Sequence, residues 1–524
     1  MTFVSFYFLV FLIAVAIAYF IVPVSARWIV LLIGSLLFYA KAGLSYLPFM
    51  AGTALLTYAG AKIISNIHED AAVKMAAASS KDEKKEIRAG EKRSASRVMW
   101  VTILIVLAYL FFTKFGKKIA LLAASAAGMK APTLMIIVPL GISYYTFSTV
   151  GYVLDVYWKR YKAEKNFFRY LLYVCYFPHI LQGPIARYDK LGVQFSQPHY
   201  FDYERVCFGV QLVLWGFFKK LVIADRFAPF VTNVLADYKR ASGSLLHFTM
   251  IIYAFQIYTD FSGCVDMARG MSQIFGIEIE QNFAQPYFAV SVEDFWRRWH
   301  ITLGAWFRDY LNMPVAVSGG VKKLSRTMRK KFGARAGQNT TTICALIAVW
   351  IATGVWHGTG WNYMLWALWQ GGILAISVLM KPVYPKMFKV LHFDPDSPEF
   401  HIFRILRTFL LCGIVPRTIV KAPSIAAAGV ILRKMFTSPG LGFFRSNVLH
   451  YGLGKMEFLI GFAALFLLFM TSVMKERGWS IRRHLAERNI LFRWAVYLFI
   501  FYLVILFGKY GQGYNAASFI YMDF

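Results

Sequence analysis

Long apolar runs separated by short polar segments set the pattern of this chain. The first 26 residues carry no charge, and Arg27 is the first charged residue. About 20 apolar residues cross ~30 Å of hydrocarbon, so residues 4–24 predict an uncleaved first span rather than a secretory signal. Further runs follow at residues 28–40, 46–65, 98–113, 132–154, 167–182, 206–224, 244–259, 341–356, 361–380, 402–432, 455–474 and 491–508.

These runs predict helices rather than the strands of a β-barrel. Barrel strands would alternate apolar and polar side chains over segments of about ten residues. Residues 8–22 and 458–470 are instead continuously apolar. Several runs are short for a full span, so some helices must be tilted, re-entrant or broken. We expect an all-α polytopic membrane protein with about 10–13 helices that cross or enter the bilayer.

Composition supports this fold class and excludes several others. Of the 524 residues 58% are hydrophobic and 16% are charged, against about 45–50% and about 25% in soluble domains. Disordered, collagen-like and disulfide-rich classes are excluded. The net charge is +30, which would suggest nucleic acid in a soluble protein. In a membrane protein it indicates basic cytoplasmic loops that contact anionic lipid, so no nucleic-acid partner is expected.

The charge is concentrated in segments between the apolar runs. Residues 66–97 mix Lys and Glu at helical offsets, which predicts a solvated helical hairpin. Residues 318–338 contain basic side chains and no acidic ones. Both segments are predicted to be cytoplasmic, which would leave the N-terminus outside. The five scattered cysteines lack metal-ligand spacing, so no metal site is predicted.

Polar residues at membrane depth are functional candidates because burying them in lipid is costly. Gln182 and Arg187 follow an apolar helix that two X-Pro steps interrupt, either in a buried cavity or in an ordinary interfacial loop. Asp260 ends an apolar run, where the alternative is capping or pairing with a nearby arginine.

Two further polar clusters each contain a histidine. At helical spacing His300 shares one side with Trp296 and Trp299, either on a helix at the membrane interface or on a buried helix that lines a cavity. His357 lies in an apolar segment rich in Gly and Trp. A lone histidine is usually a packing residue, but the nearby glycines allow close backbone approach, and a neutral imidazole is a natural general base.

Four stretches together resemble the membrane-bound O-acyltransferase family, in particular its bacterial branch of envelope O-acetylation and D-alanylation proteins. The stretches are YFPHILQGPIARY (176–188), DFSGCVDMARG with FGIEIEQNFAQPY (260–287), SVEDFWRRWHITLGAWFRDYL (291–311) and GVWHGTGWNYMLW (354–366). The resemblance covers most of the chain and implies one membrane domain over 1–524, a ring of tilted helices around a tunnel. After RDYL the chain departs from the usual pattern with a more basic loop.

The resemblance implies acyl transfer from a cytoplasmic thioester toward hydroxyls outside, at the plasma (inner) membrane of a bacterium. The donor would be acetyl-CoA or an acyl carrier protein thioester, with no permanently bound cofactor. A cell-envelope polysaccharide would be the acceptor, and a separate outer-face transferase or esterase-like protein the partner. His357 would be the general base, and His300 would orient the acyl carbonyl or lie near the donor.

The remaining site residues follow from the same resemblance. Four tryptophans are expected to keep the site dry, namely Trp296, Trp299, Trp356 and Trp361. Arg297 and Arg298 are expected to meet an anionic donor, with lipid phosphate as the alternative contact. Three polar residues are expected along the substrate path, namely Asp260, Gln182 and Arg187.

The aromatic tail 509–524 ends SFIYMDF. Similar tails in the family suggest that Tyr521 carries the acyl group as a phenyl ester, which has a good leaving group. The alternative is an aromatic membrane anchor. Two other function classes stay open for the whole chain: a transporter or flippase of a lipid-linked saccharide, and a non-catalytic scaffold for an outer transferase.

Overall fold

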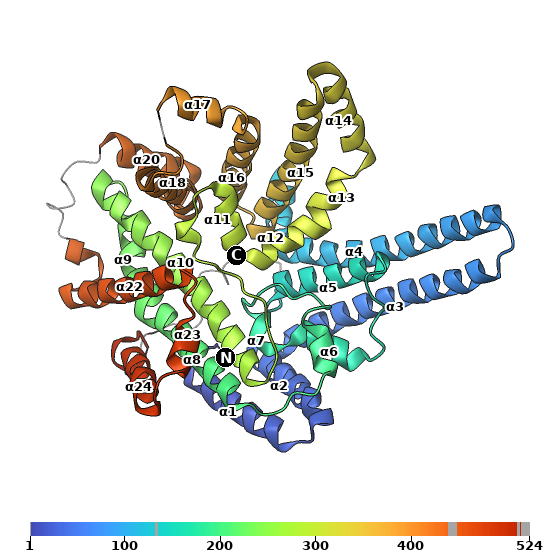
Figure 1. Cartoon of the computed structure of the whole chain (residues 1–524), viewed down its shortest axis with the longest axis horizontal. Coiled ribbons are helices and arrows are strands. Elements are labelled where there is room, and N and C mark those ends of the chain that lie inside the picture. Colours follow the sequence, from blue (N-terminus) through green and yellow to red (C-terminus); the bar gives the residue numbers. More distant parts are fainter. Residues whose placement is uncertain (1, 131–134, 393, 439–447, 511–513, 515–524) are drawn as a thin grey trace. The chain divides into compact units, whose positions relative to one another are not determined.

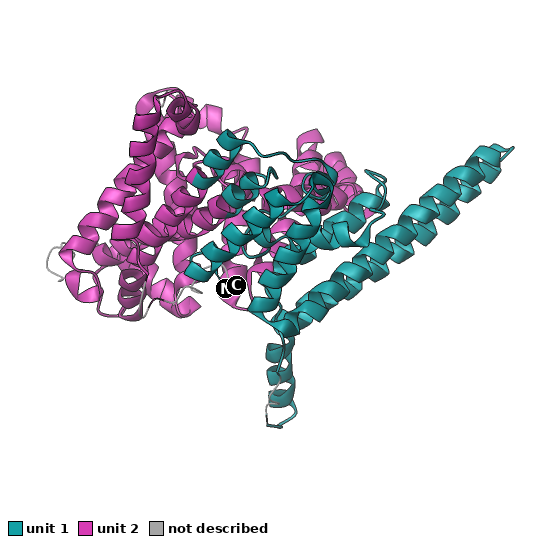
Figure 2. Cartoon of the chain, turned by 90° about the horizontal axis from the view of Figure 1, so that it is seen from below, with its two compact units in different colours: residues 1–210, 268–280 teal, residues 211–267, 281–524 magenta. Residues whose placement is uncertain are grey.

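The structure is a computed structural model that describes residues 2–130, 135–392, 394–438, 448–510 and 514. Helices form all the extended regular structure in these residues, and the single β-bridge there joins Phe283 and Trp299. The predicted all-α fold is therefore confirmed. The chain divides into two compact units, residues 1–210 with 268–280 and residues 211–267 with 281–524 (Figure 2).

The first unit contains the N-terminal helices, coloured blue to green in Figure 1. They are α1 (Phe6–Ile21), α2 (Arg27–Ala42), α3 (Leu47–Ala77), α4 (Lys81–Ala126), α5 (Ile142–Tyr157), α6 (Phe167–Cys175) and α7 (Phe177–Ile180). The start of α8 (Tyr203–Phe217) and the end of α10 (Gly243–Ile274) also belong to it.

Helices α3 and α4 form a long antiparallel hairpin (Figure 1). They contain 31 and 46 residues, so at 1.5 Å per residue both exceed the ~30 Å hydrocarbon thickness. Ser80 caps α4 by accepting from the Glu83 amide at 3.1 Å, and Glu83 accepts from the Ser79 amide at 3.0 Å. The charged segment 66–97 is thus a helical hairpin, as its Lys and Glu pattern predicts.

The first unit packs around buried tyrosines of α5 and α6. Tyr152 and Tyr170 have ring centroids 4.5 Å apart, and the Tyr170 hydroxyl lies 2.8 Å from that of Thr57 on α3. Tyr173 donates to the backbone oxygen of Ala186 at 2.9 Å. Because these hydroxyls bond to polar groups on other segments, the core fixes the chain around the Pro-interrupted α6–α7 turn.

The second unit contains the rest of the chain. Its helices are α9 (Asp225–Ala236), most of α10, α11 (Val292–Arg298), α12 (Ile301–Phe307), α13 (Met313–Ala316), α14 (Gly319–Phe332), α15 (Ala334–His357), α16 (Trp361–Met380), α17 (Tyr384–Val390), α18 (Pro398–Phe409), α19 (Val415–Lys421), α20 (Ile425–Thr437), α22 (Lys455–Glu476), α23 (Ile481–Ala486) and α24 (Ile490–Phe507). Three π-helical turns interrupt this series at η4 (Phe218–Ala224), η6 (Arg308–Asn312) and η7 (Leu410–Ile414).

Two glycines bring α8 and α10 into backbone contact within the second unit. A Cβ atom on Gly216 would lie 2.6 Å from the Gly263 carbonyl oxygen, and one on Gly263 would lie 2.9 Å from that of Gly216. Any larger residue would push the helices apart, as at other small-residue crossings in membranes. This crossing places the π-helical turn η4 directly against α10.

Residues 292–314 do not form the single helix that their spacing predicts. The chain forms α11, breaks at Trp299 and His300, and continues as α12, η6 and α13. His300 has φ 51° and ψ 52°, a left-handed conformation that ends helical hydrogen bonding. Trp296, Trp299 and His300 therefore do not share one helical face, and their positions follow from the break.

Eight helical segments among the described residues are long and apolar enough to cross a membrane. They are Val24–Ala42, Leu44–Ala77, Lys81–Ala126, Tyr203–Ala236, Ala334–His357, Trp361–Met380, Lys455–Glu476 and Ile490–Phe507. The shorter apolar helix α1 lies within the expected first span. The chain is a multi-pass membrane protein, as its apolar runs predict.

Candidate active site

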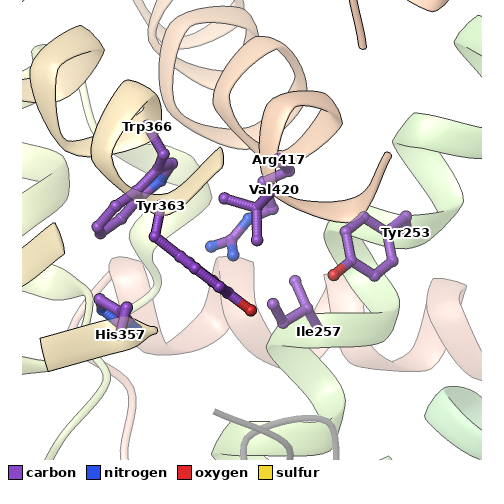
Figure 3. A pocket seen from close by; sticks show the side chains of 7 residues that line it. All are labelled: Tyr253, Ile257, His357, Tyr363, Trp366, Arg417 and Val420. Carbon is purple, nitrogen blue, oxygen red and sulfur yellow. The ribbon is translucent and has the colours of Figure 1, made fainter. Parts of the chain in front are cut away.

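His357 is the last residue of α15 and is 7% exposed. Its ring lies among aromatic side chains, with centroids 4.7 Å from Trp356 and 4.9 Å from Trp366. Tyr363 stacks nearly parallel to it at 6.4 Å. Because α15 ends at His357 and α16 begins at Trp361, a short turn places Tyr363 and Trp366 of α16 beside the imidazole (Figure 3).

A small pocket opens beside His357. Four helices of the second unit contribute to it, and Figure 3 shows the side chains converging. The lining residues are Tyr253, Ile257, His357, Tyr363, Trp366, Arg417 and Val420. A largely apolar cavity with a few convergent polar groups is the usual form of a small-molecule site.

His300 is oriented by Asn282. The carboxamide Oδ1 of Asn282 accepts from the amide of Thr302 at 3.0 Å and from its hydroxyl at 2.9 Å. The same oxygen lies 3.3 Å from His300 Nδ1. Since an acceptor oxygen faces Nδ1, this nitrogen donates, and the neutral ring is fixed as the Nδ1–H tautomer.

Burial keeps His300 neutral. The side chain is 2% exposed, and desolvation lowers its pKa from 6.5 to about 3. The Phe261 ring on α10 lies 4.9 Å from the imidazole at 81°, which adds to the apolar enclosure. At neutral pH His300 can therefore accept a proton or orient a polar group, but it does not carry a fixed positive charge.

The two histidines meet at the same tryptophan. The Trp356 ring centroid lies 6.3 Å from that of His300 and 4.7 Å from that of His357. The histidines are far apart in sequence, and the α11–α12 break and the end of α15 bring them together. Arg417 and Trp299 extend this group, since the guanidinium carbon lies 4.2 Å from the Trp299 ring centroid.

The predicted tryptophans divide into two sets. Trp296 donates from Nε1 to Gln370 at 3.1 Å and contacts Trp366, which contacts His357. Trp299 and Trp356 are buried beside the histidines. Trp361, in contrast, is 71% exposed at the start of α16 and does not line the pocket. Its expected role in keeping the site dry stays a prediction.

The two arginines of α11 form ion pairs instead of lining the pocket. Arg297 pairs with Glu293 at 2.5 Å, and its side chain is 67% exposed. Arg298 binds Asp294 at 3.1 Å and Glu476 at 2.8 Å. Because Glu476 ends α22, Arg298 joins α11 to that helix. Contact of Arg297 or Arg298 with an anionic donor stays a prediction.

Asp260 belongs to a buried charge cluster beside η4. Lys220 lies 2.5 Å from Asp260 and 2.8 Å from Asp225. Its neighbour Lys219 lies 2.8 Å from Asp266 and donates to Ser262 at 2.9 Å. The arginine partner considered for Asp260 is thus replaced by lysines. Lys219 and Lys220 lie near the end of the apolar run 206–224. Two adjacent lysines in such a run are a sequence signal for a buried ion pair.

The C-terminal tail reaches this cluster. The Tyr514 hydroxyl donates to Asp225 at 2.8 Å, and the Lys509 amide donates to the Leu221 carbonyl at 3.1 Å. Asp260 lies one turn along α10 from the pocket residue Ile257. The start of the tail is therefore held next to the helix that forms one pocket wall. Tyr521 lies outside the described residues.

Gln182 and Arg187 lie in the first unit and are described within it. Gln182 is fully buried, and neither of its amide atoms has a hydrogen-bond partner among the described residues. Arg187 lies 3.2 Å from Asp189 and 3.9 Å from Asp155. The nearby His179 donates from Nδ1 to the Tyr176 carbonyl at 2.8 Å, and burial lowers its pKa to about 4.

Sequence reasoning missed three residues of the site. These are Arg417, Tyr363 and Asn282. Arg417 does have a sequence signal, since it is a charge within the apolar run 402–432. Tyr363 and Asn282 carry no local signal, because their role comes from contacts distant in sequence. In the described part of the chain no group of three His, Cys, Asp or Glu side chains could hold a metal ion.

The geometry defines a class: a helical multi-pass membrane protein with one buried histidine in an aromatic pocket and a second buried histidine beside the same tryptophan. The chain belongs to the membrane-bound O-acyltransferase family, whose sequence model matches residues 33–329. That match includes His300 and Asp260 and ends before His357. Family membership makes the protein a membrane O-acyltransferase.

Three bacterial relatives illustrate the similarity. The chain is 29% identical over 427 residues to a probable alginate O-acetylase, AlgI, of Azotobacter vinelandii, covering 80% of this chain and 74% of the relative. It is 29% identical over 384 residues to the peptidoglycan O-acetyltransferase of Helicobacter pylori, covering 67% and 63%. It is 29% identical over 276 residues to the teichoic acid D-alanyltransferase of Bacillus subtilis, covering 52% and 65%. The last two matches span less than two thirds of the relative.

Proposed function

We propose that the protein moves an acetyl group from a cytoplasmic thioester toward hydroxyls of a cell-envelope polysaccharide. The observation that carries this proposal is His357, buried at one end of a pocket that also presents two tyrosines and an arginine. The relatives are named for O-acetylation and D-alanylation of envelope polymers, which supports the same acceptor class. Acetyl-CoA or an acylated carrier protein is the donor, and no cofactor stays bound.

In the proposed mechanism His357 is the general base. The imidazole takes the proton of the acceptor hydroxyl as that oxygen bonds to the thioester carbonyl carbon. The tetrahedral intermediate then collapses, the C–S bond breaks, and the thiolate leaves with the proton that His357 had taken. His300, neutral and fixed by Asn282, orients the acyl carbonyl. Trp356 and Trp366 limit water around the reacting atoms and strengthen local electrostatics.

The exposed helix α14 is the proposed donor-binding surface. Six of its side chains are basic, and it contains no acidic residue. The phosphates of coenzyme A or an acidic carrier protein would complement this charge. We place α14 at the cytoplasmic face because cytoplasmic loops carry an excess of lysine and arginine.

The acceptor step is proposed to pass through the C-terminal tail. Tyr521 would take the acyl group as a phenyl ester and give it to an outer-face transferase. Support comes from Tyr514, whose bond to Asp225 holds the tail beside α10. Tyr521 follows Tyr514 by seven positions in the sequence, and an extended chain of seven residues reaches about 23–25 Å.

Incubating the reconstituted protein with labelled acetyl-CoA or labelled acyl carrier protein tests the function and the relay together. We expect label on the protein, located on the tail peptide, and its loss in Tyr521→Phe, which removes one oxygen. Tyr510→Phe is the matched control, because this tail tyrosine bonds to the backbone of Ile505 instead of the charge cluster. If neither acetyl-CoA nor the acyl carrier protein donates an acyl group, the proposed function is contradicted. Label and product that both survive Tyr521→Phe would contradict the relay alone.

A further inference from the structure

Arg417 is a buried cation in the His357 pocket, and no acidic side chain among the described residues pairs with it. It is 9% exposed and lines the pocket with His357 (Figure 3). In the described part of the chain no carboxylate lies within 4 Å of its guanidinium, and its Nε has no hydrogen-bond partner. The buried lysines Lys219 and Lys220 of the same unit, in contrast, are paired with aspartates.

An unpaired buried guanidinium is costly, and proteins normally neutralise it. The cost is offset when an anion occupies the pocket during function. The side chains that line the pocket offer no negative charge, so the guanidinium is placed to bind an anion that the substrate or the reaction brings to it. Arg417 thus points to a negative charge that forms or binds beside His357.

The local fold fixes the direction of the guanidinium. The π-helical turn η7 and Pro416 precede it and start α19, and π-turns are often found at functional sites. The guanidinium carbon lies over the Trp299 ring, 4.2 Å from its centroid. A cation–π contact with a ring uses the charge of the guanidinium and needs no hydrogen-bond acceptor, so this contact leaves N–H donors available at the pocket.

We propose that Arg417 is a catalytic residue that donates hydrogen bonds to the oxyanion of the tetrahedral intermediate. This inference rests on the proposed acyl transfer and deepens it. When the acceptor oxygen bonds to the thioester carbon, the carbonyl π-electron pair moves onto oxygen and creates a negative charge. Arg417 stabilises that charge until the C=O bond re-forms and the thiolate departs. Donors positioned before the charge develops lower the barrier without reorganisation.

The competing role is ground-state binding of an anionic group of the donor or acceptor, such as a phosphate or carboxylate. The two roles differ in kinetics. Oxyanion stabilisation acts in the transition state and lowers kcat, whereas uniform binding of an anionic group raises KM and leaves kcat unchanged.

Steady-state transfer kinetics of Arg417→Gln and Arg417→Lys test the proposal. We expect Arg417→Gln to lower kcat by about 10²–10³-fold with KM changed by less than about threefold. Arg417→Lys keeps the charge but loses the planar fork, so its kcat falls less, by at least about tenfold. Arg433→Gln, an exposed arginine on α20, is the matched control and keeps wild-type kinetics. Wild-type kcat in the Arg417 variants, or a rise in KM alone, would overturn the proposal.

Folding and the underlying function are separated by two readouts. The thermal midpoint in detergent shows whether a variant has folded. If Arg417→Gln does not fold, the kcat of Arg417→Lys tests the proposal instead, with the decrease of at least about tenfold as the expected result. Transfer by the wild type decides the proposed function. Inactive wild-type protein rejects the function itself, whereas active wild type with fully active Arg417 variants rejects only this inference.

Discussion

The surroundings of His300 determine both its backbone conformation and which ring nitrogen carries the proton. Its positive φ lies at the α11–α12 break, and Asn282 holds its Nδ1 while Thr302 holds Asn282. A non-glycine residue in the left-handed region costs on the order of 1 kcal/mol and persists where neighbours enforce it. The carboxamide–imidazole contact fixes which nitrogen carries the proton. His300 is therefore prepared as a neutral group with Nε2 as its basic nitrogen.

The lowered pKa of His300 predicts acid sensitivity of folding. The unfolded ring has a pKa of 6.5 and the folded one about 3, so between these values the unfolded state binds more protons. The free energy of unfolding then falls as pH drops below 6.5, by at most about 1.4 kcal/mol per pH unit for one such group. Above pH 6.5 this contribution is constant. The thermal midpoint in detergent, measured between pH 7.5 and 4.5, reports the effect.

Replacement of the ring isolates its share of that acid sensitivity. His300→Gln keeps a polar side chain that does not titrate, so its midpoint is expected to depend less steeply on pH than that of the wild type. The buried His179 retains its own contribution, because burial also lowers its pKa. The exposed His484 serves as control, and His484→Gln should keep the wild-type slope. Equal slopes for His300→Gln and the wild type would contradict a buried neutral His300.

At the scale of elements, broken helices carry most of the chemistry. Arg417 follows η7, the two buried lysines lie in η4, and His300 lies between α11 and α12. Each interruption turns a side chain that a regular helix would direct elsewhere. Proline placement anticipates the break at α6–α7, but π-turns have no sequence signature. Ion pairs between residues distant in sequence, such as Lys220 with Asp260, cannot be predicted from local patterns either.

Helix α14 supplies the element-scale prediction. Lys330→Glu with Lys331→Glu reverses two of its exposed charges. If α14 binds an anionic donor, the donor KM rises about 3–10-fold at low salt with kcat unchanged, and the difference shrinks as ionic strength screens the charges. Transfer rates measured across donor and salt concentrations check this.

The control for α14 lies on the long hairpin. Lys84→Glu with Lys85→Glu makes the same charge change on exposed residues of α4, and donor KM should stay at its wild-type value. A KM increase of equal size in both pairs would indicate a general charge effect. An unchanged KM in the α14 pair would remove α14 as the donor surface.

For the whole molecule, the sequence predicts the class and the organisation well. Continuous apolar runs predict the membrane helices, and the mixed charges of 66–97 predict the α3–α4 hairpin. His300 and His357 stand out because an ionisable group in an apolar segment is rare. Trp361 shows the limit of such reasoning, since this tryptophan lies near His357 in sequence but is exposed and does not line the pocket. The ring, the tunnel and the cytoplasmic side of the hairpin stay predictions.

The central claim is that His357 is the general base of acyl transfer. The direct measurement compares transfer of labelled acetyl from thioester to acceptor by wild-type, His357→Ala and His484→Ala protein, each with its thermal midpoint. We predict that His357→Ala keeps the wild-type midpoint and loses at least about 10²-fold in kcat, while the exposed His484→Ala stays fully active. Wild-type kcat in folded His357→Ala would contradict the account.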